Sequence, residues 1–140
     1  LLGDIYMMPA AGGQARLILG GPAWEWQPRF SPDGRRLAFT SDRDGLVNVW
    51  TMNLDGKDLR QISKEREREV SNPVWTPDGQ YLVARKHFRN TRSLGSGEMW
   101  LYHVAGGRTR QPCASPQTSP ASLTGVSLPA PDVPVESEAK

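Results

Sequence analysis

The sequence lacks several features that would point to a particular compartment or ligand. Its single cysteine, Cys113, excludes a disulfide within the chain and leaves the redox compartment open. No apolar run approaches the roughly 18 residues of a membrane span, and no basic-then-apolar leader is present. The formal net charge is only +2, and no nucleic-acid-binding motif accompanies it. We therefore expect neither membrane insertion nor nucleic-acid binding.

Residue patterns typical of enzymes are also missing. The two histidines, His87 and His103, form neither a His-x-His pair nor a cluster with metal-ligand spacing. There is no Gly-x-Ser-x-Gly elbow and no Walker-type loop, and Ser96 between two glycines is typical of a turn. The acidic turn from Ser41 to Gly45 has no partner glutamate at calcium-loop distance. We predict no catalytic residue, no metal site and no cofactor in this chain.

Aromatic residues are absent from the C-terminal part of the chain. All eleven lie between Tyr6 and Tyr102, whereas residues 111–140 hold six of the twelve prolines and five serines. Such a stretch buries too little apolar surface to offset an ordering cost of roughly 1–2 kcal/mol per residue. We predict a structured domain over residues 1–110 and a disordered, Pro/Ser-rich tail over residues 111–140.

The structured part contains an internal repeat. Residues 26–39 align with residues 71–84 at an offset of 45, which matches Phe30 with Trp75 and superimposes two Pro-Asp-Gly turns. In a second frame, Tyr6, Trp50 and Trp100 occupy one phase. A period near this length fits a four-stranded propeller blade. We expect aromatic residues that recur at the blade period to pack between adjacent blades.

Turn residues divide the repeat into strands. Asp-Gly and Gly-Gly pairs supply the positive φ that tight hairpins require, and short segments of alternating apolar residues run between them. The sequence therefore predicts an all-β fold, a partial β-propeller of about two and a half four-stranded antiparallel blades. The predicted blade pieces are residues 3–20, 27–63 and 72–110, with the last strand of the third piece around residues 108–111.

The stretch from Phe30 to Gly56 carries a Ser-Pro-Asp-Gly turn, a Ser-Asp-Arg-Asp-Gly turn, a Val-Trp pair and a closing Asp-Gly. This order resembles the TolB-type, WD-like propeller repeat, and the resemblance covers residues 3–107. Members of that family form closed propellers, often exported to the bacterial periplasm, that stand alone as docking proteins or precede a hydrolase domain. The stretch from Ala84 to His103 is similar to the propeller that precedes an amidohydrolase domain in some large bacterial proteins.

This resemblance implies a non-catalytic propeller module for interaction, docking or substrate gating. Its leading form is a piece of the propeller of a larger amidohydrolase-type hydrolase, periplasmic or otherwise exported. The alternatives are a free-standing TolB-like periplasmic protein and the propeller of a prolyl-oligopeptidase-type serine peptidase. The expected partners are proteins, namely the remaining blades and a fused or docked domain.

The candidate partner-binding residues lie in an enlarged hairpin. Asp78 and Trp100 are five residues farther apart than Asp33 and Trp50, and no acidic residue lies between Asp78 and Glu98. The basic residues in this interval are Arg85, Lys86, His87, Arg89 and Arg92. Loops on a rigid scaffold are frequent sites of function. The hairpin either docks an acidic partner or is a solvated hairpin that its glutamate-bearing neighbour neutralises.

Up-and-down connectivity places this hairpin at the same end as the links between blades. One link carries Trp24 and Trp26, and another carries the charged run from Lys64 to Glu69. The two tryptophans lie outside the phase of the aromatic repeat, so we consider them as partner-binding residues beside the basic hairpin.

Overall fold

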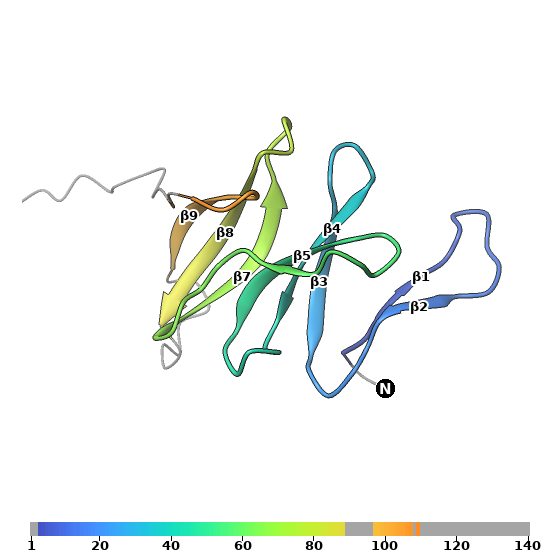
Figure 1. The fold of residues 1–140 in the computed structure, drawn as a ribbon, viewed down its shortest axis with the longest axis horizontal. Helices are drawn as coiled ribbons and strands as arrows, with labels where there is room; N and C mark the ends of the chain where they lie inside the picture. Colours follow the sequence, from blue (N-terminus) through green and yellow to red (C-terminus); the bar gives the residue numbers. More distant parts are fainter. Residues whose placement is uncertain (1–2, 89–96, 108, 110–140) are drawn as a thin grey trace, which may run out of the picture.

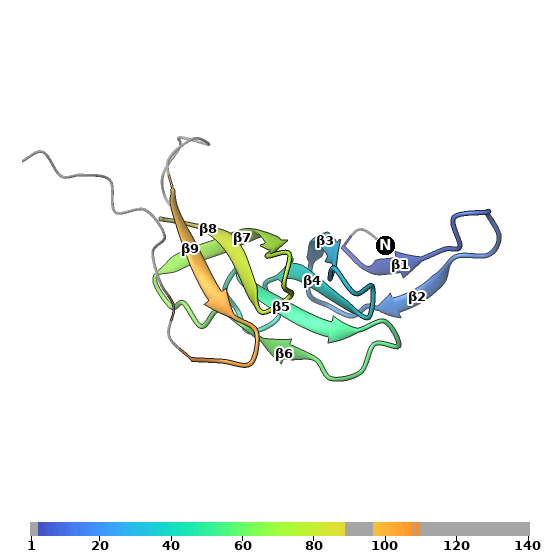
Figure 2. The same cartoon turned by 90° about the horizontal axis from the view of Figure 1, so that it is seen from above.

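The computed structural model describes residues 3–88, 97–107 and 109, and the predicted tail at 111–140 lies outside them. Within these described residues, nine strands form three antiparallel sheets that follow one another in chain order across the molecule (Figures 1 and 2). The first sheet is β1 (Ile5–Met7) and β2 (Arg16–Leu19); the second is β3 (Glu25–Phe30), β4 (Arg36–Ser41), β5 (Asn48–Asn53) and β6 (Arg60–Gln61); the third is β7 (Arg68–Trp75), β8 (Tyr81–Phe88) and β9 (Glu98–His103). The predicted all-β class, an open partial propeller, is confirmed.

The Pro-Asp-Gly turns are built alike in the second and third sheets. Gly34 and Gly79 both adopt a φ of 67°, a left-handed conformation that favours glycine. In the first turn the carboxylate of Asp33 accepts hydrogen bonds from the hydroxyl of Ser31 and the backbone N–H of Arg35. Thr76, Asp78 and Gln80 repeat this arrangement in the second turn. The repeated motif therefore gives the same hairpin twice.

The core lies on both faces of the second sheet. Leu37, Phe39 and Met52 pack with Ile5 of the first sheet, and Ala38 and Val49 pack on the opposite face. The residues that meet this second face are Val70, Leu82, Ala84, Tyr102 and Val104. Successive strand residues alternate between the two faces, so one strand contributes to both clusters. Each fully buried large apolar side chain contributes roughly 1.5–3 kcal/mol, and these two clusters hold the three sheets together.

The first strands of the second and third sheets contain equivalent irregularities. Gln27 and Asn72 are non-glycine residues with a φ of 56°, and the pairing register shifts beside each of them. The side-chain Oε1 of Gln27 accepts from the backbone N–H of Asn72 at 2.8 Å, while its Nε2 donates to Asn72 Oδ1 at 2.6 Å. The two bulges thus connect neighbouring sheets.

These bulges change the strand boundaries that the sequence suggests. β3 begins at Glu25 and β7 at Arg68, before the predicted blade pieces 27–63 and 72–110. Trp26 therefore lies in a strand, opposite Thr40, and its assignment to a link is wrong. The bulge accommodates a left-handed residue without ending the strand, so pairing continues on its N-terminal side.

The expected packing of repeated aromatics holds for three positions and fails for two. Trp50, Trp75 and Trp100 are partly buried against the core clusters, whereas Phe30 is 58% exposed and Tyr6 is 48% exposed. Phe30 is paired with Leu37, which packs with Ile5, so Phe30 lies on the face of the second sheet that is turned toward the first sheet. Tyr6 lies on the opposite face of β1 from the buried Ile5. Neither side chain is covered by a neighbouring sheet in the way that Trp75 packs on the cluster shared with the second sheet.

Candidate interaction surface

Links and hairpins gather at the two ends of the sheets as the connectivity predicts. The turns after β3 and after β7 lie at one end (Figure 1). The hairpin between β4 and β5 and the C-terminal end of β8 lie at the opposite end, together with the link that enters β7. This second end carries the charged run of residues 64–69 and the described part of the basic hairpin.

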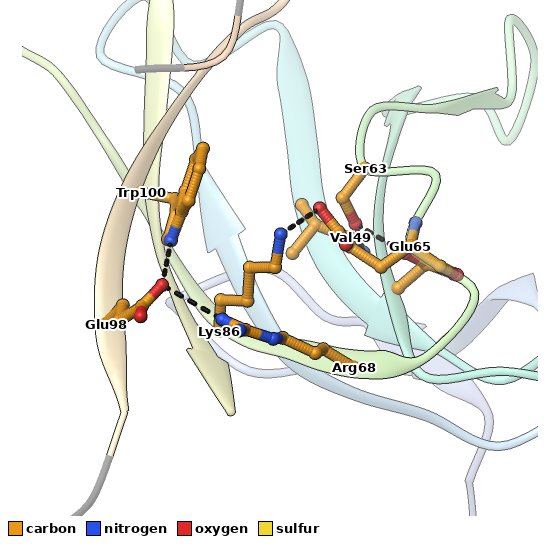
Figure 3. Close-up of polar contacts among 8 residues, drawn as sticks. Val49, Ser63, Glu65, Arg68, Lys86, Glu98 and Trp100 are labelled. Atoms are coloured by element: carbon orange, nitrogen blue, oxygen red, sulfur yellow. Dashed lines mark hydrogen bonds and ion pairs between the residues drawn. The ribbon is translucent and has the colours of Figure 1, made fainter. Parts of the chain in front are cut away.

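Asn48 fixes the link between the second and third sheets. Its buried Oδ1 accepts from the hydroxyl of Ser63 at 2.8 Å and from the backbone N–H of Glu65 at 3.1 Å. Its Nδ2 donates to the backbone carbonyl of Glu65 and to the carboxylate of Asp44. The hydroxyl of Ser63 in turn accepts from the N–H of Val49 (Figure 3). A buried amide with four partners holds Glu65 in place.

Glu65 is positioned to meet Lys86 of the third sheet. Lys86 Nζ lies 2.7 Å from Glu65 Oε1, and its side chain is only 12% exposed (Figure 3). The same ammonium lies 4.3 Å from the ring centroid of Trp100, within the range of a cation–π contact. Lys86 is therefore engaged inside the chain on two sides.

A second ion pair, near the first, joins Arg68 to Glu98. Arg68 NH1 lies 3.0 Å from Glu98 Oε2, and Trp100 Nε1 donates to the same oxygen at 2.9 Å (Figure 3). The hydrogen bond from Trp100, with the nearby charges of Arg68 and Lys86, holds the pKa of Glu98 below its usual value. The guanidinium of Arg68 also lies 4.1 Å from the ring centroid of Phe88. Glu98 is therefore an anion at neutral pH.

The cleft between these groups has a volume of about 540 Å³ and a nearly balanced charge. Four cations and three carboxylates line it together with Trp100; they are Lys64, Arg66, Arg68, Lys86, Glu65, Glu67 and Glu98. Because the signs alternate, the described part of this end offers a mixed polar surface.

The predicted partner-binding residues that the structure describes do not form one group. Lys86 lines the cleft, while His87 lies opposite Glu69, and Arg85 lies opposite Met99, in the strand pairing of the third sheet. Arg89 and Arg92 lie outside the described residues.

The two tryptophans belong to the second sheet and its entry. Trp24 is 58% exposed, and its backbone N–H donates to Asp42 Oδ1 at 2.8 Å. Trp26 is partly buried in β3. Neither lines the cleft, so the structure does not bring them together with Lys86.

Three contributors to the cleft were missed by sequence reasoning. Trp100 follows the aromatic repeat, which predicts packing alone, and Glu98 marks only the end of the basic interval in the sequence. Asn48 does not lie at a spacing from other polar residues that would suggest a site. A usable signal was the charge pattern across a predicted hairpin, since Lys86 and Glu98 are direct partners in the register of β8 and β9.

No group of three or more histidine, cysteine, aspartate or glutamate residues with metal-binding geometry occurs in the part of the chain that the structure describes. No helix within the described ranges is long and apolar enough to cross a membrane.

Comparison with known proteins places these features in context. A family model described as the TolB beta propeller domain matches residues 2–122. The uncharacterized peptidase YuxL of Bacillus subtilis (strain 168) is 42% identical over 72 residues, which are 51% of this chain and 10% of that protein. The Tol-Pal system protein TolB of Bordetella pertussis is 43% identical over 58 residues, 41% of this chain and 13% of that protein. The chain thus corresponds to a small part of either relative.

A solved structure supports the fold independently. A TolB-like protein of Agrobacterium tumefaciens superimposes with a TM-score of 0.67 at 24% sequence identity. The match covers 76% of this chain and 39% of that one. At this identity the likeness concerns the fold.

Proposed function

The chain belongs to the TolB β-propeller domain family, and on that premise we propose that it is a non-catalytic docking module within a larger bacterial protein. The observation that carries the proposal is the arrangement at the link end of the sheets. There, Asn48 and two ion pairs fix a link and a hairpin edge on a rigid scaffold. Rigidly held loops on a propeller are suited to recognising another protein surface.

We propose that further blades of the same propeller cover both ends of the open arc. The contact between the second and third sheets shows how one blade covers the next, since Trp75 Nε1 donates to the backbone carbonyl of Arg29 at 3.1 Å. The equivalent Phe30 is exposed at one end, and Val74 and Met99 are 53% and 47% exposed at the other. Exposed apolar side chains at repeat positions are expected where a repeat protein continues.

The docked or fused domain is proposed to be a hydrolase. The resemblance of residues 84–103 to propellers that precede an amidohydrolase domain supports this form. The similarity to a Bacillus peptidase favours the alternative that the propeller serves a serine peptidase. The similarity to a Tol-Pal system protein favours a free-standing docking protein.

The sequence of the parent protein on either side of residues 1–140 discriminates among these three forms. A barrel bearing a His-x-His pair supports the amidohydrolase, and a Gly-x-Ser-x-Gly elbow supports the peptidase. Further blades alone support the free-standing protein. We propose a periplasmic or otherwise exported location, which fractionation of cells that produce the tagged parent protein tests.

We propose that the basic hairpin makes the docking contact through cations beyond Lys86, because Lys86 is already paired with Glu65. Arg89 and Arg92 of the hairpin then meet an acidic surface. Exposed charge contacts of this kind are screened over about 8 Å at physiological ionic strength, so the association should weaken as salt is added.

The test is binding of the chain to the rest of its parent protein at about 50 mM and about 300 mM salt. Replacing Arg89 and Arg92 with glutamine should weaken binding at low salt and flatten its salt dependence. A matched variant at the opposite end, Arg35→Gln with Lys57→Gln, should bind as the wild type does. Equal binding by the hairpin variant and the wild type would contradict the docking role of the hairpin.

A further inference from the structure

The bulge in β7 is held by a side chain of the preceding sheet. The backbone N–H of Asn72 donates to Gln27 Oε1 at 2.8 Å, and Asn72 Oδ1 accepts from Gln27 Nε2 at 2.6 Å. The hydroxyl of Thr40 donates to the same oxygen of Gln27 at 3.0 Å and fixes the amide in place. One glutamine of the second sheet thus supports the left-handed residue of the third sheet.

The bulge in β3 has the same backbone but no such support. Gln27 and Asn72 share a φ of 56°, and the pairing register shifts beside both. The N–H of Gln27 is therefore directed as that of Asn72 is, yet no side chain in the described part of the chain accepts from it. A non-glycine residue keeps a left-handed conformation only where its surroundings fix it. The equivalence predicts an acceptor on a neighbouring strand.

Two further positions show the same difference between the two sheets. Pro73 is fully buried, whereas the equivalent Pro28 is exposed. Trp75 is partly buried and its Nε1 donates to the carbonyl of Arg29, whereas the equivalent Phe30 is 58% exposed. The second sheet covers all three positions of β7, and no described strand covers their counterparts in β3.

The first sheet corresponds to the outer half of a blade. Tyr6 pairs with Leu17 as Trp50 pairs with Gln61, so β1 and β2 occupy the places of β5 and β6. No described strand beside β1 corresponds to β3 or β4. The first sheet meets β3 at its start, where the N–H of Glu25 donates to the carbonyl of Gly3 at 2.6 Å. Phe30, at the other end of β3, lies roughly 16 Å further along.

We propose that β3 and β1 together bind a β-hairpin, the inner hairpin of the preceding blade, whose first strand presents a glutamine side chain to the backbone N–H of Gln27. The same strand covers Pro28 and Phe30, and the second strand of the hairpin pairs with β1 as β4 pairs with β5. The inference rests on the proposed continuation of the propeller, and it specifies the side chain that aligns one blade with the next.

The probe is a fluorescein-labelled peptide with the sequence of residues 25–41, which contains β3, its turn and β4. Anisotropy titration with the full chain measures its binding. The peptide with Gln27→Ala loses the acceptor and should bind roughly two- to tenfold more weakly, the range expected for one hydrogen bond. The peptide with Arg29→Gln keeps the backbone carbonyl and should bind as the original does. Absence of binding by the original peptide, or equal affinity of the Gln27→Ala peptide, would overturn the proposal.

Two variants of the chain locate the site by a gain of affinity. Phe30→Trp supplies the indole N–H that Trp75 uses, and the carbonyl of Arg29 in the peptide can accept it. Binding should become roughly two- to tenfold tighter. Phe88→Trp makes the same change at a residue of the third sheet that is 53% exposed, and it should leave affinity unchanged. Equal affinity of Phe30→Trp and wild type, or an equal gain in both variants, would overturn the assignment of the hairpin to β3.

Sequencing the gene of the parent protein separates this contact from the continuation of the propeller. Gln27 and Asn72 are 45 residues apart, so a glutamine or asparagine that precedes a proline is expected at about that distance before Gln27. A blade pattern that carries a residue without an acceptor side chain at this position would leave the continuation in place and overturn the amide contact. The absence of any blade pattern there would overturn both.

Discussion

Replacing Asn48 with alanine should loosen the link on which the docking end is built. The Asn48 side chain joins Ser63, Asp44 and both backbone groups of Glu65 through four hydrogen bonds. Alanine leaves the Ser63 hydroxyl and the Glu65 backbone without these partners. The link then no longer holds Glu65 against Lys86.

The expected loss follows from the number and burial of these bonds. A typical hydrogen bond contributes about 0.5–1.5 kcal/mol net, and water can replace those at the exposed side of the link. We therefore expect the free energy of unfolding to fall by about 2–4 kcal/mol. With a urea dependence of roughly 1–3 kcal/mol per molar, the midpoint of the tryptophan fluorescence transition should fall by about 0.7–4 M.

Asn53→Ala is the matched control. Asn53 ends the same strand and is half-buried, but its side chain makes none of the hydrogen bonds described for Asn48. It should change stability by no more than about 0.5 kcal/mol. If Asn48→Ala unfolds within that margin of the wild type, the link is not held by Asn48 and this reasoning is wrong.

Three further predictions concern packing, acidity and association. Trp75→Phe keeps an aromatic side chain but removes the indole N–H that donates to the Arg29 carbonyl, so thermal unfolding should show a loss of at least about 1 kcal/mol. The pKa values of Asp33 and Asp78 are lowered from 3.8 because hydroxyls and backbone N–H groups donate to them, so their stabilisation is complete above that pH and is lost as the pH falls through the lowered values. Replacing both with asparagine should flatten the pH dependence of the melting temperature below about pH 4; an unchanged slope would contradict this. Because Phe30 and the other end-face residues are exposed, the isolated chain should self-associate at micromolar concentration in size-exclusion chromatography, and a sharply cooperative monomer would count against the open arc.

The repeat was sufficient to predict the sheets but not their boundaries. Turn residues such as Gly34 and Gly79 adopt a conformation that other residues avoid, so the sequence alone predicts the turns. Gln27 and Asn72 adopt a left-handed conformation without being glycine, and tertiary hydrogen bonds between them stabilise it. A constraint of this kind depends on a neighbour in space, and no local pattern reveals it.

The gathering of charged segments at this end of the sheets was predictable, but the pairing of their side chains was not. Connectivity placed the basic hairpin beside the charged link, yet the alternating signs of residues 64–69 fit several pairings. The structure selects Glu65 for Lys86 and Arg68 for Glu98. Asn48 makes this selection by fixing the backbone of Glu65, and a single buried amide has no signature in the sequence.

The most direct test of the docking role is amide hydrogen exchange of the chain alone and in complex with the rest of its parent protein. The account predicts that binding slows exchange at the link around Glu65 and at the hairpin ends near Lys86 and Glu98. The turns at Gly34 and Gly79, at the opposite end of the sheets, should exchange at unchanged rates. Protection confined to those turns, with none at the link, would contradict the account.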